Sequence, residues 1–268
     1  MIKNLTFNKS LFLITGSLAL IAALWGVLDP DMYEPVVGAR QIPGVFTQDL
    51  IVILAALVMI FLSIRMKEDD YRRAIVIFGV LGFLFYAYGI YAIEQVYTPL
   101  YLLYLAILAL SFFVPAYSLV SLEHPPIEAL TLPPAIRYIA AGYGIFIAVM
   151  FNFIWISALI PLIQTHDRIE NAFSVFIIDL VFIMPAFVIL AILLIRNHAL
   201  GIVGIPAMFI LGVGILSPLA LAELLSPVRY GRPMIINELL LYGTLSSVFL
   251  IFAAVYLIAL KPAKRMGK

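Results

Sequence analysis

The stretch AFSVFIIDLVFIMPAFVILAILLI, residues Ala172–Ile195, decides the fold of this chain. It holds a single charged residue, Asp179, among its 24 positions. A helix needs roughly 20 mostly apolar residues to cross the hydrocarbon core of a bilayer. The stretch therefore predicts a membrane-spanning helix with an acidic side chain about 10 Å inside it, at 1.5 Å of rise per residue.

Seven further stretches of the same kind flank it. We place these predicted spans at Leu11–Leu28, Leu50–Ile64, Ala74–Tyr91, Leu100–Val120, Tyr138–Ile163, Leu200–Leu225 and Ile235–Leu260. Over the whole chain, 65% of the residues are hydrophobic and 12% are charged, against about 25% charged residues in soluble domains. In a lipid bilayer each span has to satisfy its own backbone, which favours helices. The sequence thus predicts an all-α, polytopic transmembrane helical bundle of eight spans, a single integral membrane domain over residues 1–268 whose first partner is the bilayer.

The lysines and arginines predict the orientation of the bundle. With the N-terminus inside, twelve of the sixteen fall in cytoplasmic segments: Lys3, Lys9, Arg65, Lys67, Arg72, Arg73, Arg137, Arg196, Lys261, Lys264, Arg265 and Lys268. The other four, Arg40, Arg168, Arg229 and Arg232, fall on the outer side. Because cytoplasmic loops carry an excess of basic residues, we expect a multi-pass cell-membrane protein with both termini in the cytoplasm. The first span is too long for a signal peptide and lacks a cleavage site, so we expect it to be retained.

Acidic residues gather on the outer side, and several lie inside predicted helices. A charge inside the membrane costs about 2.5–3.5 kcal/mol, so such residues usually face a partner or a water-filled cavity. We therefore predict an outward-facing polar pocket. Its candidate residues are Gln48, Asp49, Glu94, Asp179, Glu223, Asn237 and Glu238. The alternative is a structural network of ion pairs between these acids and the four outer arginines.

Tyrosines cluster around the predicted third and fourth spans. They are Tyr86, Tyr88, Tyr91, Tyr97, Tyr101 and Tyr104. Tyr97 and Tyr101 lie where tyrosines anchor helices at the membrane–water interface. Tyr86 and Tyr88 lie deeper and need partners for their hydroxyl groups. We favour a packing role for these two, with pocket lining as the alternative.

The sequence lacks the residues that several functional classes require. The chain has no cysteine and only three histidines, so a Cys-ligated metal, a three-histidine zinc site and bis-histidine haem are not expected. No lysine lies inside a predicted span, which excludes a retinal Schiff base, and no basic stretch suggests binding to nucleic acid. A cofactor is therefore unknown. His166, Asp167 and Glu170 remain weak candidates for an oxygen-rich cation site.

Two stretches combine polar residues with apolar runs in a distinctive order. The first has Gln48-Asp49 at the start of the second span, then Arg72-Arg73 and the sequence LFYAY at residues 84–88. The second runs from Asp179 to Met184-Pro185 and on to Arg196. Together they resemble a widespread family of uncharacterised bacterial multi-pass membrane proteins. The resemblance covers most of the chain and implies the membrane architecture, but it implies no activity.

These observations favour a small transporter or channel with an acidic, outward-facing pocket for a cation or cationic solute, since a carboxylate-lined vestibule attracts cations. A less favoured alternative is an intramembrane enzyme that acts on a lipid or isoprenoid with Asp179 and Glu238 as acid and base. A third is a sensor or assembly subunit that binds another membrane protein. The sequence is compatible with a homo-oligomer.

Overall fold

A computed structural model describes residues 4–68, 70–120, 127, 129–169 and 172–262. Its helices, in chain order, are α1 Leu5–Leu28, η1 Pro30–Tyr33, α2 Ile42–Arg65, α3 Tyr71–Ile93, α4 Tyr101–Val120, α6 Pro134–Thr165, α7 Phe173–Ile178, η2 Asp179–Ile183, α8 Met184–Ile195, α9 Ala199–Tyr230 and α10 Ile236–Ala259. Outside the helices, the described residues form one isolated β-bridge and no strand. Eight helices are long and apolar enough to cross a membrane, with α7, η2 and α8 together forming one of them. The predicted all-α polytopic bundle is confirmed.

Several helices, α1 among them, extend beyond their predicted bounds, and the extensions of α2 and α9 matter most for the polar residues. Helix α2 begins at Ile42, eight residues before the predicted start, because Pro43 occupies its first turn, where proline is well tolerated. Gln48 and Asp49 therefore lie inside this span. Helix α9 continues past its predicted end at Leu225, through Pro227, and ends where Gly231 adopts φ 61°.

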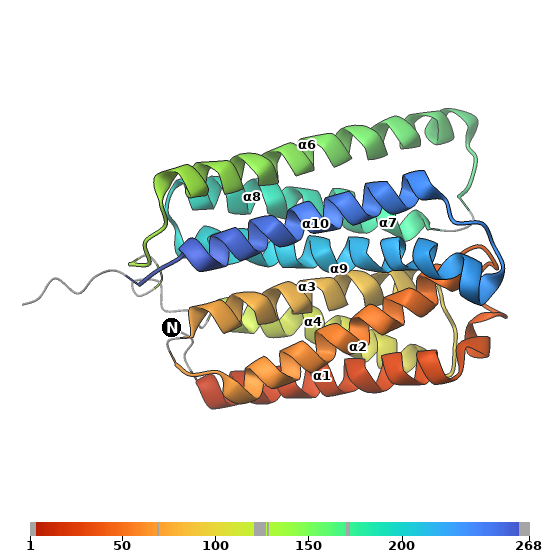
Figure 1. The fold of residues 1–268 in the computed structure, drawn as a ribbon, viewed down its shortest axis with the longest axis horizontal. Helices are drawn as coiled ribbons and strands as arrows, with labels where there is room; N and C mark the ends of the chain where they lie inside the picture. Colours follow the sequence, from red (N-terminus) through yellow and green to blue (C-terminus); the bar gives the residue numbers. More distant parts are fainter. Residues whose placement is uncertain (1–3, 69, 121–126, 128, 170–171, 263–268) are drawn as a thin grey trace, which may run out of the picture.

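The bundle consists of two groups of four spans with the same order of contacts. Within α1–α4 each helix contacts the next, and α1 also contacts α4; the group from α6 to α10 repeats this pattern. The third span of each group, α3 and α9, meets its counterpart at the centre (Figure 1). Accordingly, 78% of the apolar window of α3 and 67% of that of α9 are buried, against at most 39% for the other spans.

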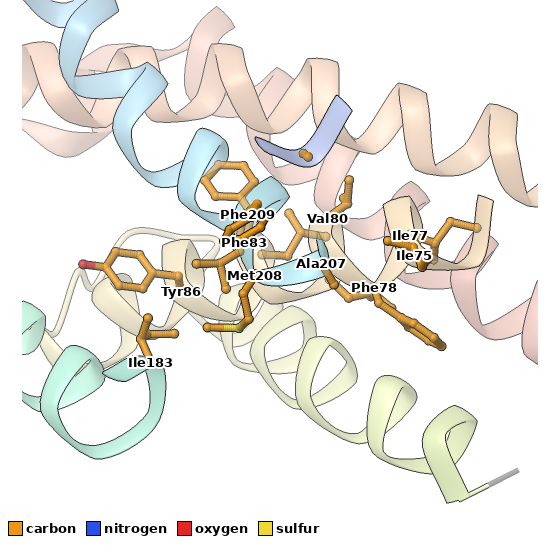
Figure 2. Close-up of a cluster of buried hydrophobic side chains, with 14 of the residues drawn as sticks. Ile75, Ile77, Phe78, Val80, Phe83, Tyr86, Ile183, Ala207, Met208 and Phe209 are labelled. Atoms are coloured by element: carbon orange, nitrogen blue, oxygen red, sulfur yellow. The ribbon is translucent and has the colours of Figure 1, made fainter. Parts of the chain in front are cut away.

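Small residues let α3 and α9 approach closely. A side chain at Gly79 would collide with Ile210 and the Ala207 carbonyl, and one at Gly214 would collide with the ring of Phe83. Close contact through small residues is the usual way in which membrane helices associate. Figure 2 shows the apolar side chains around this contact, with the hydroxyl of Tyr86 directed away from them.

The two ends of the bundle differ in what they contain. We call the end where α1 begins and α10 ends the terminal end, and the opposite one the distal end (Figure 1). At the terminal end a two-way backbone bridge joins Thr131 and Lys261, with N–O distances of 2.7 and 3.0 Å. The distal end holds η1 and the connections α3–α4 and α9–α10. Residues 1–3 and 263–268 lie outside the described part, so the predicted placement of the two chain ends stays a prediction.

Candidate functional site

Asp49 is a buried carboxylate on the second turn of α2, with 2% of its surface exposed. The hydroxyl of Tyr33 donates to its Oδ2 atom at 2.8 Å, and that of Tyr91 donates to Oδ1 at 3.4 Å. The carboxylate lies directly against Gly26 of α1, where any added side chain would collide with Asp49 and with the Tyr33 hydroxyl. Three helices and the short helix η1 thus position this one acid.

A chain of hydroxyl groups extends from Asp49 to the α3–α4 connection. The Tyr33 hydroxyl also lies 3.2 Å from that of Tyr104, to which Thr98 Oγ1 donates at 3.1 Å. The rings of Tyr91 and Tyr104 are in contact, with centroids 5.0 Å apart. We call Tyr33, Asp49, Tyr91, Thr98 and Tyr104 the Asp49 cluster.

Tyr88, one turn from Tyr91 on α3, packs against this cluster. Its ring centroid lies 5.8 Å from that of Tyr91 and 5.6 Å from that of Tyr104. Its hydroxyl donates to the carbonyl of Ala19 in α1, at 3.4 Å. Tyr88 therefore has the packing role that we favoured for it, and it closes one side of the Asp49 cluster.

No basic side chain of the described residues forms an ion pair or a hydrogen bond with Asp49. Among the described residues the ion pair that forms is Arg73–Asp70, at the terminal end. Of the outer arginines, Arg229 lies over the ring of Phe46, 3.9 Å from its centroid, and Arg232 donates to a backbone carbonyl. The network of ion pairs that we considered as an alternative is therefore not formed in the described part of the chain. Instead, burial raises the pKa of the Tyr33 hydroxyl well above its ordinary value, so this group remains a donor to Asp49.

Asp179 forms a second buried carboxylate setting, with 5% of its surface exposed. Trp155 Nε1 of α6 donates to its Oδ2 at 2.8 Å, and the Tyr86 hydroxyl of α3 lies within hydrogen-bonding reach. The π-helical turn η2 begins at this residue. Such turns are local departures from the α-helical ladder and are frequent at functional sites. The hydrogen bond that the structure gives Asp179 thus comes from an indole, and among the described residues no arginine forms an ion pair with it.

Gln48 and Glu94 bridge helices in the same region. Gln48 Nε2 lies 3.5 Å from the carbonyl of Ala87, which links α2 to α3. Glu94 Oε1 accepts from the backbone N–H of Ser174 at 2.7 Å, so it caps the start of α7 from the end of α3. A carboxylate at a helix N-terminus is a stabilising arrangement in its own right. The structure thus gives Glu94 a structural role.

The remaining candidates lie at the corner between α9 and α10. Glu223 Oε2 accepts from the backbone N–H of Ile235 at 2.8 Å, and both Glu223 and Glu238 act electrostatically on Tyr242. Asn237 is exposed on the first turn of α10. These residues share no hydrogen bond with Asp49 or Asp179. The predicted single pocket is thus divided into two buried carboxylate settings and one surface corner.

The weak metal candidates do not form a cluster in the described part of the chain. His166 ends α6 in a left-handed conformation, and Asp167 accepts from the hydroxyl of Thr165. Glu170 lies outside the described residues. Among those that are described, no three His, Asp or Glu side chains are placed to hold one metal ion.

Two partners of the buried acids were absent from our sequence-based site. Tyr33 lies in the short segment between the first two spans, and Trp155 lies 24 residues before Asp179 in the preceding helix. A tyrosine and a tryptophan in or beside apolar runs are typical of packing and interfacial positions. No spacing signal in the sequence connects either residue to its acid.

Comparison with known proteins leaves the relationship of this chain to others open. No protein family, no curated protein and no solved structure matches it. The resemblance noted from the sequence stays a prediction. What the structure establishes is an eight-helix integral membrane bundle with two buried, hydrogen-bonded aspartates.

Proposed function

We propose that this protein is a small proton-coupled transporter in which Asp49 takes up and releases the proton. The observation that carries the proposal is a carboxylate buried within a spanning helix and bonded to tyrosine hydroxyls, with no cationic partner among the described residues. Ionisable residues inside membrane proteins are costly, and they typically mark ion pathways and proton relays. At a buried position with only a structural role, a well-packed apolar residue of similar volume would usually be at least as stable.

The hydroxyl chain supplies a route for the proton. Thr98, Tyr104 and Tyr33 lead from the α3–α4 connection at the distal end to Asp49. A hydroxyl group both donates and accepts, so each member of such a chain can pass a proton to the next. We assign the distal end to the outer face, following the excess of basic residues in the cytoplasmic segments. The proton would then enter Asp49 from outside the cell membrane.

The other functional interpretations have less support. An intramembrane enzyme that uses Asp179 and Glu238 needs these two groups around one substrate, but they make separate sets of contacts. A cation or a cationic solute remains the alternative occupant of the Asp49 cluster. Tyrosine rings and hydroxyls together with a carboxylate suit such a ligand. The experiment below separates it from a proton.

The test is infrared difference spectroscopy of the reconstituted protein between acidic and neutral pH. We expect a band from a protonated carboxyl group that is lost in Asp49→Asn and retained in Asp179→Asn, which serves as the matched control. Proteoliposomes with an internal pH-sensitive dye should also show slower proton entry for Asp49→Asn. An unchanged band in Asp49→Asn would overturn the proposal. A band that disappears when sodium chloride replaces choline chloride at constant pH would assign the group to a metal cation instead.

A further inference from the structure

The two tryptophans of the chain precede the two buried aspartates by the same distance. Trp25 lies 24 residues before Asp49, and Trp155 lies 24 residues before Asp179. A leucine follows each aspartate directly. Each tryptophan belongs to the first span of its group of four, and each aspartate lies near the start of the second span. The same motif thus occurs twice, 130 residues apart, at matching places in the two halves of the bundle.

The second spans stay in register after the aspartates, apart from one extra residue. An Ile-Arg pair closes both, and its arginine comes 16 residues after Asp49 but 17 residues after Asp179. The π-helical turn η2 begins at Asp179, and a turn with i→i+5 hydrogen bonds accommodates one additional residue. At a spacing of 130 residues, none of the four buried residues that follow Asp49 in α2 would have a buried counterpart. At 131 residues three of them do: Val52 with Ile183, Ala56 with Phe187 and Ser63 with Leu194.

The central helices α3 and α9 match in the same way. The dipeptide Leu-Gly occurs at residues 81–82 of α3 and at residues 211–212 of α9, again 130 residues apart. A side chain at Gly82 would meet Leu211. One at Gly214 would meet Phe83, so residues about that far apart lie side by side. Each of the two helices also contacts the second span of the other half, α3 with α7 and α9 with α2. Because each half has four spans, both run in the same direction, which is the arrangement of a parallel internal repeat.

The side chains that face Asp179 can serve both of its protonation states. Trp155 of α6 donates to Oδ2, and Tyr86 of α3 is the titratable group within reach. An indole N–H can only donate, whereas a phenol can donate to a carboxylate or accept from a carboxylic acid. Glu94, at the end of α3, is bonded to the backbone of Ser174 instead, and among the described residues no base pairs with Asp179. An adjacent arginine would favour the charged form alone. The arrangement therefore accommodates both the gain and the loss of a proton.

We propose that the two halves are an internal duplication and that Asp179, the counterpart of Asp49, binds a second proton. The inference rests on the proposed role of Asp49, which it extends to the other half. The two settings differ in their donors. Trp155 bonds to Asp179 at 2.8 Å. Trp25, by contrast, is 51% exposed, and the Tyr33 hydroxyl takes its place beside Asp49. Each carboxyl group therefore has hydrogen bonds of its own, which give it a separate infrared band.

The test applies infrared difference spectroscopy between acidic and neutral pH to both carboxyl groups of the reconstituted full-length protein. We expect two bands from protonated carboxyl groups. One should be lost in Asp179→Asn and retained in Asp49→Asn, and the other should show the reverse pattern. Trp155→Phe should move the Asp179 band to higher frequency, because the carboxyl C=O loses its donor. Trp25→Phe is the matched control at the equivalent position of the other half and should leave both bands unchanged.

The outcomes separate this inference from the proposed role of Asp49. A pH-dependent band from Asp49 without a second one would overturn the inference and leave that role intact. A band from Asp179 alone would overturn the role of Asp49 and the second proton with it. If Asp179→Asn does not fold, Trp155→Phe decides, because it leaves the carboxyl group in place. Two bands that both stay unmoved in Trp155→Phe would then overturn the inference.

Discussion

Replacing Tyr33 by phenylalanine removes the central hydroxyl of the Asp49 cluster and leaves the ring in place. That hydroxyl donates to Asp49 at 2.8 Å and lies 3.2 Å from the Tyr104 hydroxyl. A hydrogen bond to a charged group contributes about 1.5–3 kcal/mol. After the substitution Asp49 retains only the 3.4 Å contact to Tyr91, which lies near the limit of a hydrogen bond. We therefore expect Tyr33→Phe to lower the free energy of unfolding by about 2–3 kcal/mol.

The same reasoning ranks the neighbouring variants. Tyr91→Phe removes only the longer bond to Asp49, so we expect a loss of about 1 kcal/mol or less. Tyr97→Phe is the control, because this tyrosine is 60% exposed. Tyr97→Phe should change the free energy of unfolding by no more than about 0.5 kcal/mol. The order Tyr33, Tyr91, Tyr97 follows from burial and distance alone.

The measurement is reversible unfolding in mixed micelles with increasing sodium dodecyl sulfate, followed by circular dichroism. A double-mutant cycle adds Asp49→Asn to Tyr33→Phe and isolates the interaction between the two side chains. We expect a coupling of at least about 1 kcal/mol for this pair. The reasoning is refuted if Tyr91→Phe destabilises as much as Tyr33→Phe, or if Tyr33→Phe and Tyr97→Phe are indistinguishable.

Three further predictions concern packing, the second carboxylate and topology. Gly214→Ala should lower the free energy of unfolding by about 1–3 kcal/mol through overpacking. Gly243 has open space around it, so Gly243→Ala should not destabilise; the same unfolding assay measures both variants. Asp179→Asn removes the charged acceptor of the Trp155 indole. The fluorescence emission of Trp155 should therefore shift when this substitution is made in a protein that lacks Trp25, and unchanged emission would contradict the 2.8 Å bond. Reporter fusions after Arg73 should give a cytoplasmic signal, and a periplasmic one would reverse the proposed orientation.

The fold was predictable because its determinants are local. Each apolar run is long enough to span a bilayer, and proline and charged residues separate the runs. The start of α2 was misplaced because Ile42–Asp49 contains polar residues that are typical of loops, yet Pro43 and the buried partners of Thr47 and Asp49 keep it helical. Contacts made by other helices decided this boundary, and a single-sequence pattern does not contain them.

The candidate site was predictable only in part, for a related reason. Asp49 and Asp179 stand out in sequence because a carboxylate in an apolar helix needs an explanation. Their partners do not stand out, because partner choice depends on how helices rotate against each other. Tyr33 reaches Asp49 from a short helix between two spans, and Trp155 reaches Asp179 from a helix with mostly lipid-facing residues. Arginines at the same depth were the alternative partners, and the described ones stay at the surface or over aromatic rings.

Helix α3 connects the two buried carboxylates, although each belongs to a different half of the bundle. Tyr91 contacts Asp49 of α2, and Tyr86 lies within reach of Asp179 where α7 continues into η2. Five residues separate these tyrosines, which places them about 140° apart around the helix axis at 100° per residue. They therefore face different neighbours from one rigid element. One helix, itself packed closely against α9 at Gly79, therefore contributes a tyrosine to each of the two carboxylate settings.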